Sequence, residues 1–248
     1  MSKFICDGDV FKKKINGVDY ELIIKVDDCA ENPRDCDLNL CKMYCWHRRY
    51  TLGDVNPFED IEACLKDCIE SCNLPRSNKD TLMEVFDDES LSLKERHKKI
   101  IYTLAKHSDV YIQYLYLYDH SGITISTSDF HDPWDSGIVG FAVVYKKDVE
   151  ENTAYKGDNW IVGAMEIISD EVETYDLYIR GECYGFDLYK IGECECCGQI
   201  ERELVCSTIS SFLGSDVFKS GLADSLQEYF DEFEDINFNV REFFEEDK

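Results

Sequence analysis

The pattern of apolar and polar positions predicts both strands and helices. Stretches rich in β-branched and aromatic side chains predict strands at residues 18–26, 111–118, 123–127, 138–145, 183–189 and 199–205. Residues 119–122 (DHSG) lie between the second and third of these stretches, so we expect a hairpin there. The last two stretches are expected to be joined by a turn that contains several cysteines.

Helical spacing of apolar residues predicts helices at residues 58–72, 91–107 and 160–180, with Gly181 placed to end the third. The first helix aligns Cys64, Cys68 and Cys72 on one face. We interpret that face as a buried stripe of small apolar side chains rather than a thiol site, because no histidine joins it. The second helix carries one basic face.

Together these elements predict an α+β fold, with a mixed, mainly antiparallel sheet, packed helices and an acidic C-terminal helical segment. Cysteine and charge distributions divide the chain into a cysteine-rich N-terminal region at residues 1–75, an α+β core at residues 76–214 and an acidic helical tail at residues 215–248. We expect these regions to form one compact domain. We keep a homo-oligomer as an alternative to a monomer.

Composition narrows the classes of partner. The chain has 248 residues, of which 44% are hydrophobic, so it can build a core despite 52 acidic against 26 basic residues. The net charge of −26 repels phosphate backbones and anionic lipids, which argues against direct nucleic-acid or membrane binding. We find no membrane-length apolar run and no signal-peptide pattern, and therefore expect a cytoplasmic protein with cationic partners.

Several acidic stretches could form a partner-binding surface. An acidic surface can imitate duplex DNA, which carries one charge per roughly 1.7 Å of axis. A charge run is equally often just a solvated face, and that alternative stays open. The candidate partner-binding residues are Asp87, Asp88, Glu89, Asp231, Glu232, Glu234, Asp235, Glu245 and Glu246.

Long motifs carry a family resemblance. They are Pro33-Arg34 followed by CWHRRYTLGD at residues 45–54, YLYDHSGITIST at 116–127, DPWDSGIVGF at 132–141 and EVETYDLYIRGECYGF at 171–186. With these motifs, residues 33–198 resemble a family of uncharacterised proteins carried by bacteriophages, plasmids and other mobile elements. Members commonly end this region with a Trp- and Gly-rich segment after Asp-Ser-Cys, whereas this chain has CSTISSFLG at residues 206–214.

The resemblance implies a mobile-element setting, in which small acidic proteins often disarm host defence, and it supplies no reaction. Our first hypothesis is therefore an inhibitor that occupies the nucleic-acid-binding surface of a host defence protein such as a nuclease, by acidic mimicry. A structural or regulatory phage protein is a further alternative.

A second hypothesis is a metal-dependent hydrolase that acts on a nucleotide or signalling molecule. Asp119, His120, Asp132 and Asp135 would supply oxygen and nitrogen ligands if the fold brought them together. The competing interpretation is that Asp119 and Asp132 are turn residues and that Trp134 is a packing anchor.

The segment Trp46-His47-Arg48-Arg49 places a base beside two cations in an acidic protein. It could recognise an anion such as phosphate or carboxylate. An internal salt-bridge cluster is the interpretation that we favour, because many carboxylates need partners.

Cysteine spacing raises the question of zinc. The 13 cysteines form two groups, and without a secretion signal we expect thiols or metal ligands rather than disulfides. Cys194 and Cys197 form a Cys-x-x-Cys-Gly turn, half of a zinc knuckle, with Cys206 and Cys183 as candidates for the other ligands. Such zinc would be structural, because four thiolates leave no open position. A cluster of free thiols is the alternative.

Overall fold

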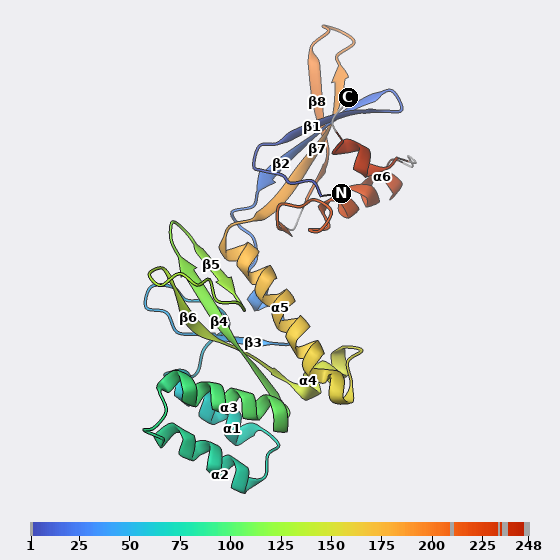
Figure 1. Ribbon diagram of the computed structural model, residues 1–248. Helices are drawn as coiled ribbons and strands as arrows, with labels where there is room; N and C mark the ends of the chain where they lie inside the picture. The colour runs from blue at the N-terminus through green and yellow to red at the C-terminus, as the bar shows by residue number, and fades with distance from the viewer. Residues whose placement is uncertain (1, 209–210, 233, 235–237, 246–248) are drawn as a thin grey trace. The chain divides into compact units, whose positions relative to one another are not determined.

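The computed structural model describes residues 2–208, 211–232, 234 and 238–245. The chain forms two compact units. Unit 1 comprises Met1–Glu31 and Leu177–Lys248, and unit 2 comprises Asn32–Asp176. Each contains an antiparallel sheet and helices, so the expected α+β class is confirmed (Figure 1).

Unit 1 is built on a sheet in the order β1-β2-β7-β8, with β9 also paired to β7. Its strands are β1 (Val10–Ile15), β2 (Val18–Val26), β7 (Cys183–Glu193), β8 (Ile200–Ser207) and β9 (Phe212–Leu213). The helix α6 (Leu222–Glu232) and the 3-10 turn η4 (Val240–Phe243) pack against this sheet. The core between them contains Tyr20, Phe186, Leu226, Phe230 and Phe243.

Unit 2 is built on a sheet in the order β3-β6-β4-β5. Its strands are β3 (Lys42–Cys45), β4 (Val110–Asp119), β5 (Ile123–Ser126) and β6 (Ser136–Tyr145). Its helices are α1 (Ile61–Ser71), α2 (Arg76–Glu84), α3 (Leu93–His107) and α4 (Lys146–Asn152), with short 3-10 turns η1 (Pro33–Asp35), η2 (Val85–Asp87) and η3 (Gly157–Asn159). The helices α1, α2 and α3 share a core with β4 and β6.

The long helix α5 (Trp160–Ile179) contributes most of its length to unit 2 and its last residues to unit 1. It ends as expected at Gly181, which has a φ of 72°. There Gly181 N donates to Tyr178 O and Glu182 N donates to Leu177 O, each at 2.9 Å. This is the Schellman arrangement that a left-handed glycine allows.

The expected elements agree with the structure, and the expected regions do not coincide with the compact units. Residues 1–75 are divided between the units, because β2 pairs with β7 and β3 pairs with β6. Residues 215–248 belong to the same unit as β7. Local patterns could not show these boundaries, because both depend on pairing between distant segments.

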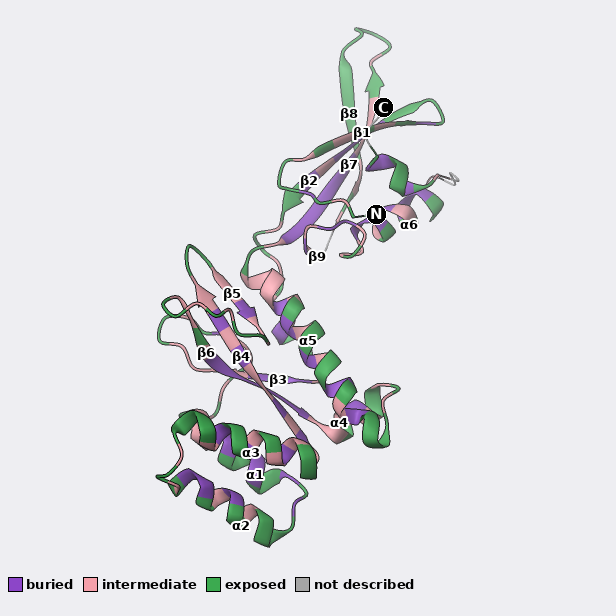
Figure 2. Ribbon diagram, viewed as in Figure 1, coloured by how far each residue is buried: buried purple, intermediate pink, exposed green. Residues whose placement is uncertain are grey.

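The predicted cysteine stripe is confirmed as core. Cys64, Cys68 and Cys72 are at most 3% exposed and pack within the helical layer of unit 2 (Figure 2). Within residues 2–208, 211–232, 234 and 238–245, none of the helices combines the length and hydropathy that a bilayer crossing requires.

Candidate functional site

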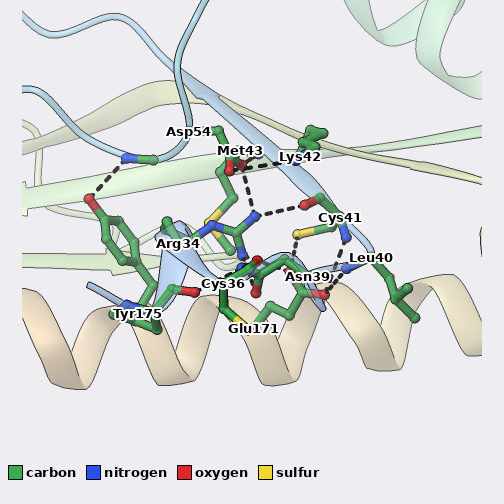
Figure 3. A network of polar contacts seen from close by, with 12 residues as sticks. Arg34, Cys36, Asn39, Leu40, Cys41, Lys42, Met43, Asp54, Glu171 and Tyr175 are labelled. Carbon is green, nitrogen blue, oxygen red and sulfur yellow. Dashed lines mark hydrogen bonds and ion pairs between the residues drawn. The ribbon is translucent and has the colours of Figure 1, made fainter. Parts of the chain in front are cut away.

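A buried polar network joins three segments of unit 2 (Figure 3). Asn32 caps η1 and Pro33 begins it, which turns the Arg34 side chain inward to 1% exposure. Arg34 Nη2 donates to Asp54 Oδ2 at 2.8 Å and to Cys41 O at 2.7 Å, and Arg34 Nη1 donates to Glu171 Oε2 at 2.6 Å. The network therefore holds the segments before and after β3 against α5.

Glu171 also binds the backbone beside β3. Its Oε1 accepts from Leu40 N at 2.7 Å, and its Oε2 accepts from Cys41 Sγ at 3.0 Å. Burial, and then the charge of Glu171, raise the pKa of the Cys41 thiol well above its usual range. Cys41 therefore stays protonated and is a poor nucleophile, which makes this network a structural one.

The predicted cluster Trp46-His47-Arg48-Arg49 follows β3 directly. Trp46 Nε1 donates to Phe58 O at 3.2 Å, and Arg49 forms an ion pair with Asp119. His47 stacks on Tyr50 with ring centroids 5.0 Å apart. The internal salt bridge that we favoured therefore involves Arg49.

Arg48 differs from its neighbours. Its side chain is exposed, and within the described part of the chain no carboxylate pairs with it. Arg48 lines a hollow of about 1140 Å³ together with Lys42, Tyr44, Trp46 and His47. Arg49 is thus a structural cation, whereas Arg48 has no carboxylate partner among the described residues.

The four residues of the hydrolase hypothesis lie near one hairpin without forming a ligand set. Asp119 binds Arg49, and His120 Nδ1 lies 3.0 Å from Asp135 Oδ2. Asp132 Oδ1 accepts from Asp135 N at 2.7 Å and from Trp134 N at 2.8 Å. These backbone hydrogen bonds, that from Asp135 first, lower the pKa of Asp132.

These contacts are those of turn residues. Among the described residues, the only group of three or more metal-ligating side chains with converging ligand atoms is Cys194, Cys196 and Cys197. The expected packing role of Trp134 is wrong, since this residue is 90% exposed.

The structure places the predicted zinc ligands apart. Cys194 and Cys197 meet at the turn after β7, where Cys196 joins them. Cys183 begins β7 and is buried, so about 11 residues at roughly 3.3 Å each separate it from Cys194 along the strand. Cys206 pairs with Leu188 in the middle of β7. The Cys-x-x-Cys spacing identified Cys194 and Cys197 as members of this cysteine cluster, but it did not identify Cys196.

The acidic candidates have different environments. Glu234 is a structural residue, because its side chain is 16% exposed and binds Lys190, Tyr20 and Tyr229 at 2.7–3.1 Å. Asp231, Glu232 and Glu245 are exposed. Asp235 and Glu246 lie outside the described residues.

The acids beside η2 lie in a mixed environment. Asp87 and Glu89 are exposed, but Asp88 accepts hydrogen bonds from Ser90. Those hydrogen bonds, and then nearby Lys99 and Arg96, hold the pKa of Asp88 below its usual range. The cations of α3 therefore compensate this acidic group in part.

The exposed face of α6 is more uniformly acidic. Asp224, Glu228, Asp231 and Glu232 are exposed and recur at helical spacing, opposite the buried Leu226 and Phe230. No Lys, Arg or His within the described residues forms an ion pair with these four. We define these four carboxylates as the α6 acidic face. Asp224 and Glu228 belong to the acidic tail expected from the sequence, but they are not among the individual candidate residues, although their i, i+4 spacing places them on one face.

Comparisons with family models, with curated proteins and with solved structures find no match for this chain.

Proposed function

We propose that this protein is an interaction protein whose α6 acidic face binds a basic, nucleic-acid-binding protein. In the mobile-element setting that the family resemblance implies, the partner would be a host defence nuclease or complex, which the protein inhibits in the cytoplasm. The observation that carries the proposal is the linear charge density of the α6 acidic face.

This density is close to that of a nucleic-acid strand. Residues 224 to 232 span about 12 Å at 1.5 Å per residue, so the four carboxylates give roughly one charge per 4 Å. One strand of duplex DNA presents one charge per about 3.4 Å. A basic cleft that accepts a phosphate backbone would find a similar row of negative charge on α6.

The chain's overall charge reinforces this local feature. At a net charge of −26, long-range attraction to a cationic cleft speeds association, and salt weakens it. The packing of α6 on the sheet through Leu226, Tyr229 and Phe230 holds the helix backbone in place, so binding costs no backbone ordering of α6.

The test is a DNA-cleavage assay with purified restriction endonucleases and CRISPR effector nucleases. One variant neutralises the α6 acidic face: Asp224→Asn, Glu228→Gln, Asp231→Asn and Glu232→Gln. The matched control removes the same charge from exposed residues of unit 2 that are not partner-binding candidates: Asp67→Asn, Glu84→Gln, Asp170→Asn and Glu173→Gln.

We expect the unchanged protein to inhibit at least one nuclease, and the α6 variant to need about tenfold more protein for the same inhibition. The control should stay close to the unchanged protein. Equal losses in both variants would reduce the effect to net charge and contradict a specific surface. Absence of inhibition across the panel would contradict the nuclease-directed role.

A further inference from the structure

Three thiols converge at the turn of the β7–β8 hairpin. Figure 2 shows the tip of this hairpin as mostly exposed. The Sγ atoms of Cys194, Cys196 and Cys197 all lie within 4.8 Å of one another, and those of Cys194 and Cys196 are 2.9 Å apart. A small hydrogen-bonded loop holds them. Gly198 N donates to Cys194 O, and Cys194 N donates to Gln199 O, each at 2.8 Å.

The loop depends on Gly198, whose φ of 69° is in the left-handed region. This conformation reverses the chain directly after Cys197, so that Gln199 O can accept from Cys194 N and close the loop. Three separations below 4.8 Å are compatible with one ion at the centre, because metal–thiolate bonds are about 2.3 Å long.

We infer that these three cysteines bind one soft, thiolate-preferring cation, Zn²⁺ or Cu⁺, through three thiolates. Thiolates select such cations over hard ones. Glu193, Glu195 and Glu201 lie beside the turn in the sequence and on the facing strand, so the local charge favours a cation. Binding releases the thiol protons to solvent, and no electrons are transferred.

The site differs from a closed zinc knuckle. Cys183 and Cys206 lie within the sheet and cannot complete it without unpairing β7. With three thiolates, a water or a donor from another molecule takes the next position on Zn²⁺, whereas Cu⁺ is satisfied by three sulfurs. The site is independent of the α6 acidic face.

The experiment titrates the reduced full-length protein with Co²⁺, whose sulfur-to-metal charge-transfer absorption reports thiolate ligation, and then displaces Co²⁺ with Zn²⁺. A second arm titrates Cu⁺ against a chromophoric chelator. Cys196→Ser removes one ligand, and Cys206→Ser is the matched control outside the loop.

We expect one metal ion per chain, an affinity loss of about 100-fold or more in Cys196→Ser, and no change in Cys206→Ser. The arm with the tighter binding identifies the cation. Absence of the charge-transfer band and of Cu⁺ binding would overturn the inference. Equal losses in the two variants would also overturn it.

The hollow beside β3 supports a second, separate inference. Its lining brings the cations Arg48 and Lys42 together with the aromatic rings of Tyr44, Trp46 and His47. Burial raises the pKa of Tyr44 to about 12, so its hydroxyl remains a hydrogen-bond donor at neutral pH.

Two carboxylates line the hollow: Asp35 is exposed, and Asp54 is neutralised. Asp54 is only 10% exposed and is engaged by Arg34 and by Met43 N, whereas Arg48 has no carboxylate partner among the described residues. A free guanidinium in a protein with a net charge of −26 is a site that an anion can reach with a charge-assisted hydrogen bond.

We propose that this hollow binds a small anionic ligand with a planar ring, of the class of a mononucleotide. Guanidinium groups recognise phosphate, and aromatic rings stack on bases. The rings of Tyr44, Trp46 and His47 are half-buried at the hollow. The volume of about 1140 Å³ exceeds what such a ligand fills, so part of the hollow stays solvated.

Isothermal titration calorimetry of the full chain with AMP, adenosine and inorganic phosphate tests this proposal. We expect AMP to bind more tightly than either fragment, and Arg48→Ala to weaken AMP binding about tenfold. The control Lys98→Ala removes an exposed cation of α3 and should have no effect. No heat with AMP, or equal affinities in Arg48→Ala and the unchanged protein, would overturn the proposal.

Discussion

Arg34 and Glu171 form an ion pair of 2.6 Å inside unit 2, although 137 positions separate them in the chain. Asp54 completes the arrangement on the same guanidinium. A buried charge that loses its partner is costly, whereas an intact pair mainly fixes geometry. Together with the hydrogen bonds from Leu40 N and Cys41 N to Glu171, this pair holds the segments beside β3 on α5.

Replacement of Arg34 should destabilise unit 2 strongly. We expect Arg34→Met to lower the free energy of unfolding by about 3–5 kcal/mol, because Asp54 and Glu171 would remain with uncompensated charge. Lys147→Met is the matched control, since Lys147 and Glu151 form an exposed pair worth less than about 1 kcal/mol. Urea unfolding measures both, and similar losses would contradict the assigned role of Arg34.

Two glycines on the same strand should differ in tolerance. A Cβ at Gly140 would lie 2.1 Å from Tyr44 O on the paired strand β3, whereas a Cβ at Gly137 meets nothing within 4 Å. Gly140→Ala should therefore cost about 1–3 kcal/mol through overpacking, and Gly137→Ala should be close to neutral. Thermal unfolding of the two variants tests the close approach of β3 and β6. A larger loss of stability in Gly137→Ala than in Gly140→Ala would contradict it.

His97 should make stability depend on pH. Burial disfavours the charged ring and lowers its pKa from 6.5. As the pH falls, His97 takes up a proton in the unfolded chain at a higher pH than in the folded chain. The free energy of unfolding is therefore highest above about pH 6.5, and it decreases as the pH falls towards the lower pKa of His97 in the folded chain. The unfolding free energy between pH 7 and pH 5 should decline less in His97→Phe than in the unchanged protein. Parallel curves would contradict this role.

Glu234 and Glu232, two residues apart in the sequence, should respond differently to truncation. Glu234 binds Lys190, Tyr20 and Tyr229, so Glu234→Ala should cost about 1–3 kcal/mol of unfolding free energy. Glu232 is exposed, and Glu232→Ala should stay within about 0.5 kcal/mol. Chemical unfolding distinguishes them, and an equal effect would remove the distinction between a structural acid and a surface acid.

The sequence was informative where local periodicity decides the structure. The stripe of Cys64, Cys68 and Cys72 and the C-terminal glycine of α5 follow from spacing within one element. The unit boundaries did not follow, because the pairing of β2 with β7 brings together segments about 160 residues apart, and no local pattern encodes such a contact.

For the candidate sites too, local sequence patterns do not show which distant residues meet or which side chains are buried. Arg34 and Asp54 stood in the motifs, but their pairing with Glu171 requires the three-dimensional fold. Glu234 looked like any other acid of the tail, because burial and not residue type distinguishes it from Glu232. Asp132 looked like a metal ligand, since turn residues and oxygen ligands are the same residue types.

The most direct test of the central claim is the salt dependence of binding between this protein and an inhibited nuclease, measured for the unchanged chain and for the variant with a neutralised α6 acidic face. We predict that affinity falls steeply with salt for the unchanged chain, and that the variant binds more weakly with a shallower slope. Equal affinities and equal slopes for the two chains would contradict the claim that the α6 acidic face occupies a nucleic-acid-binding cleft.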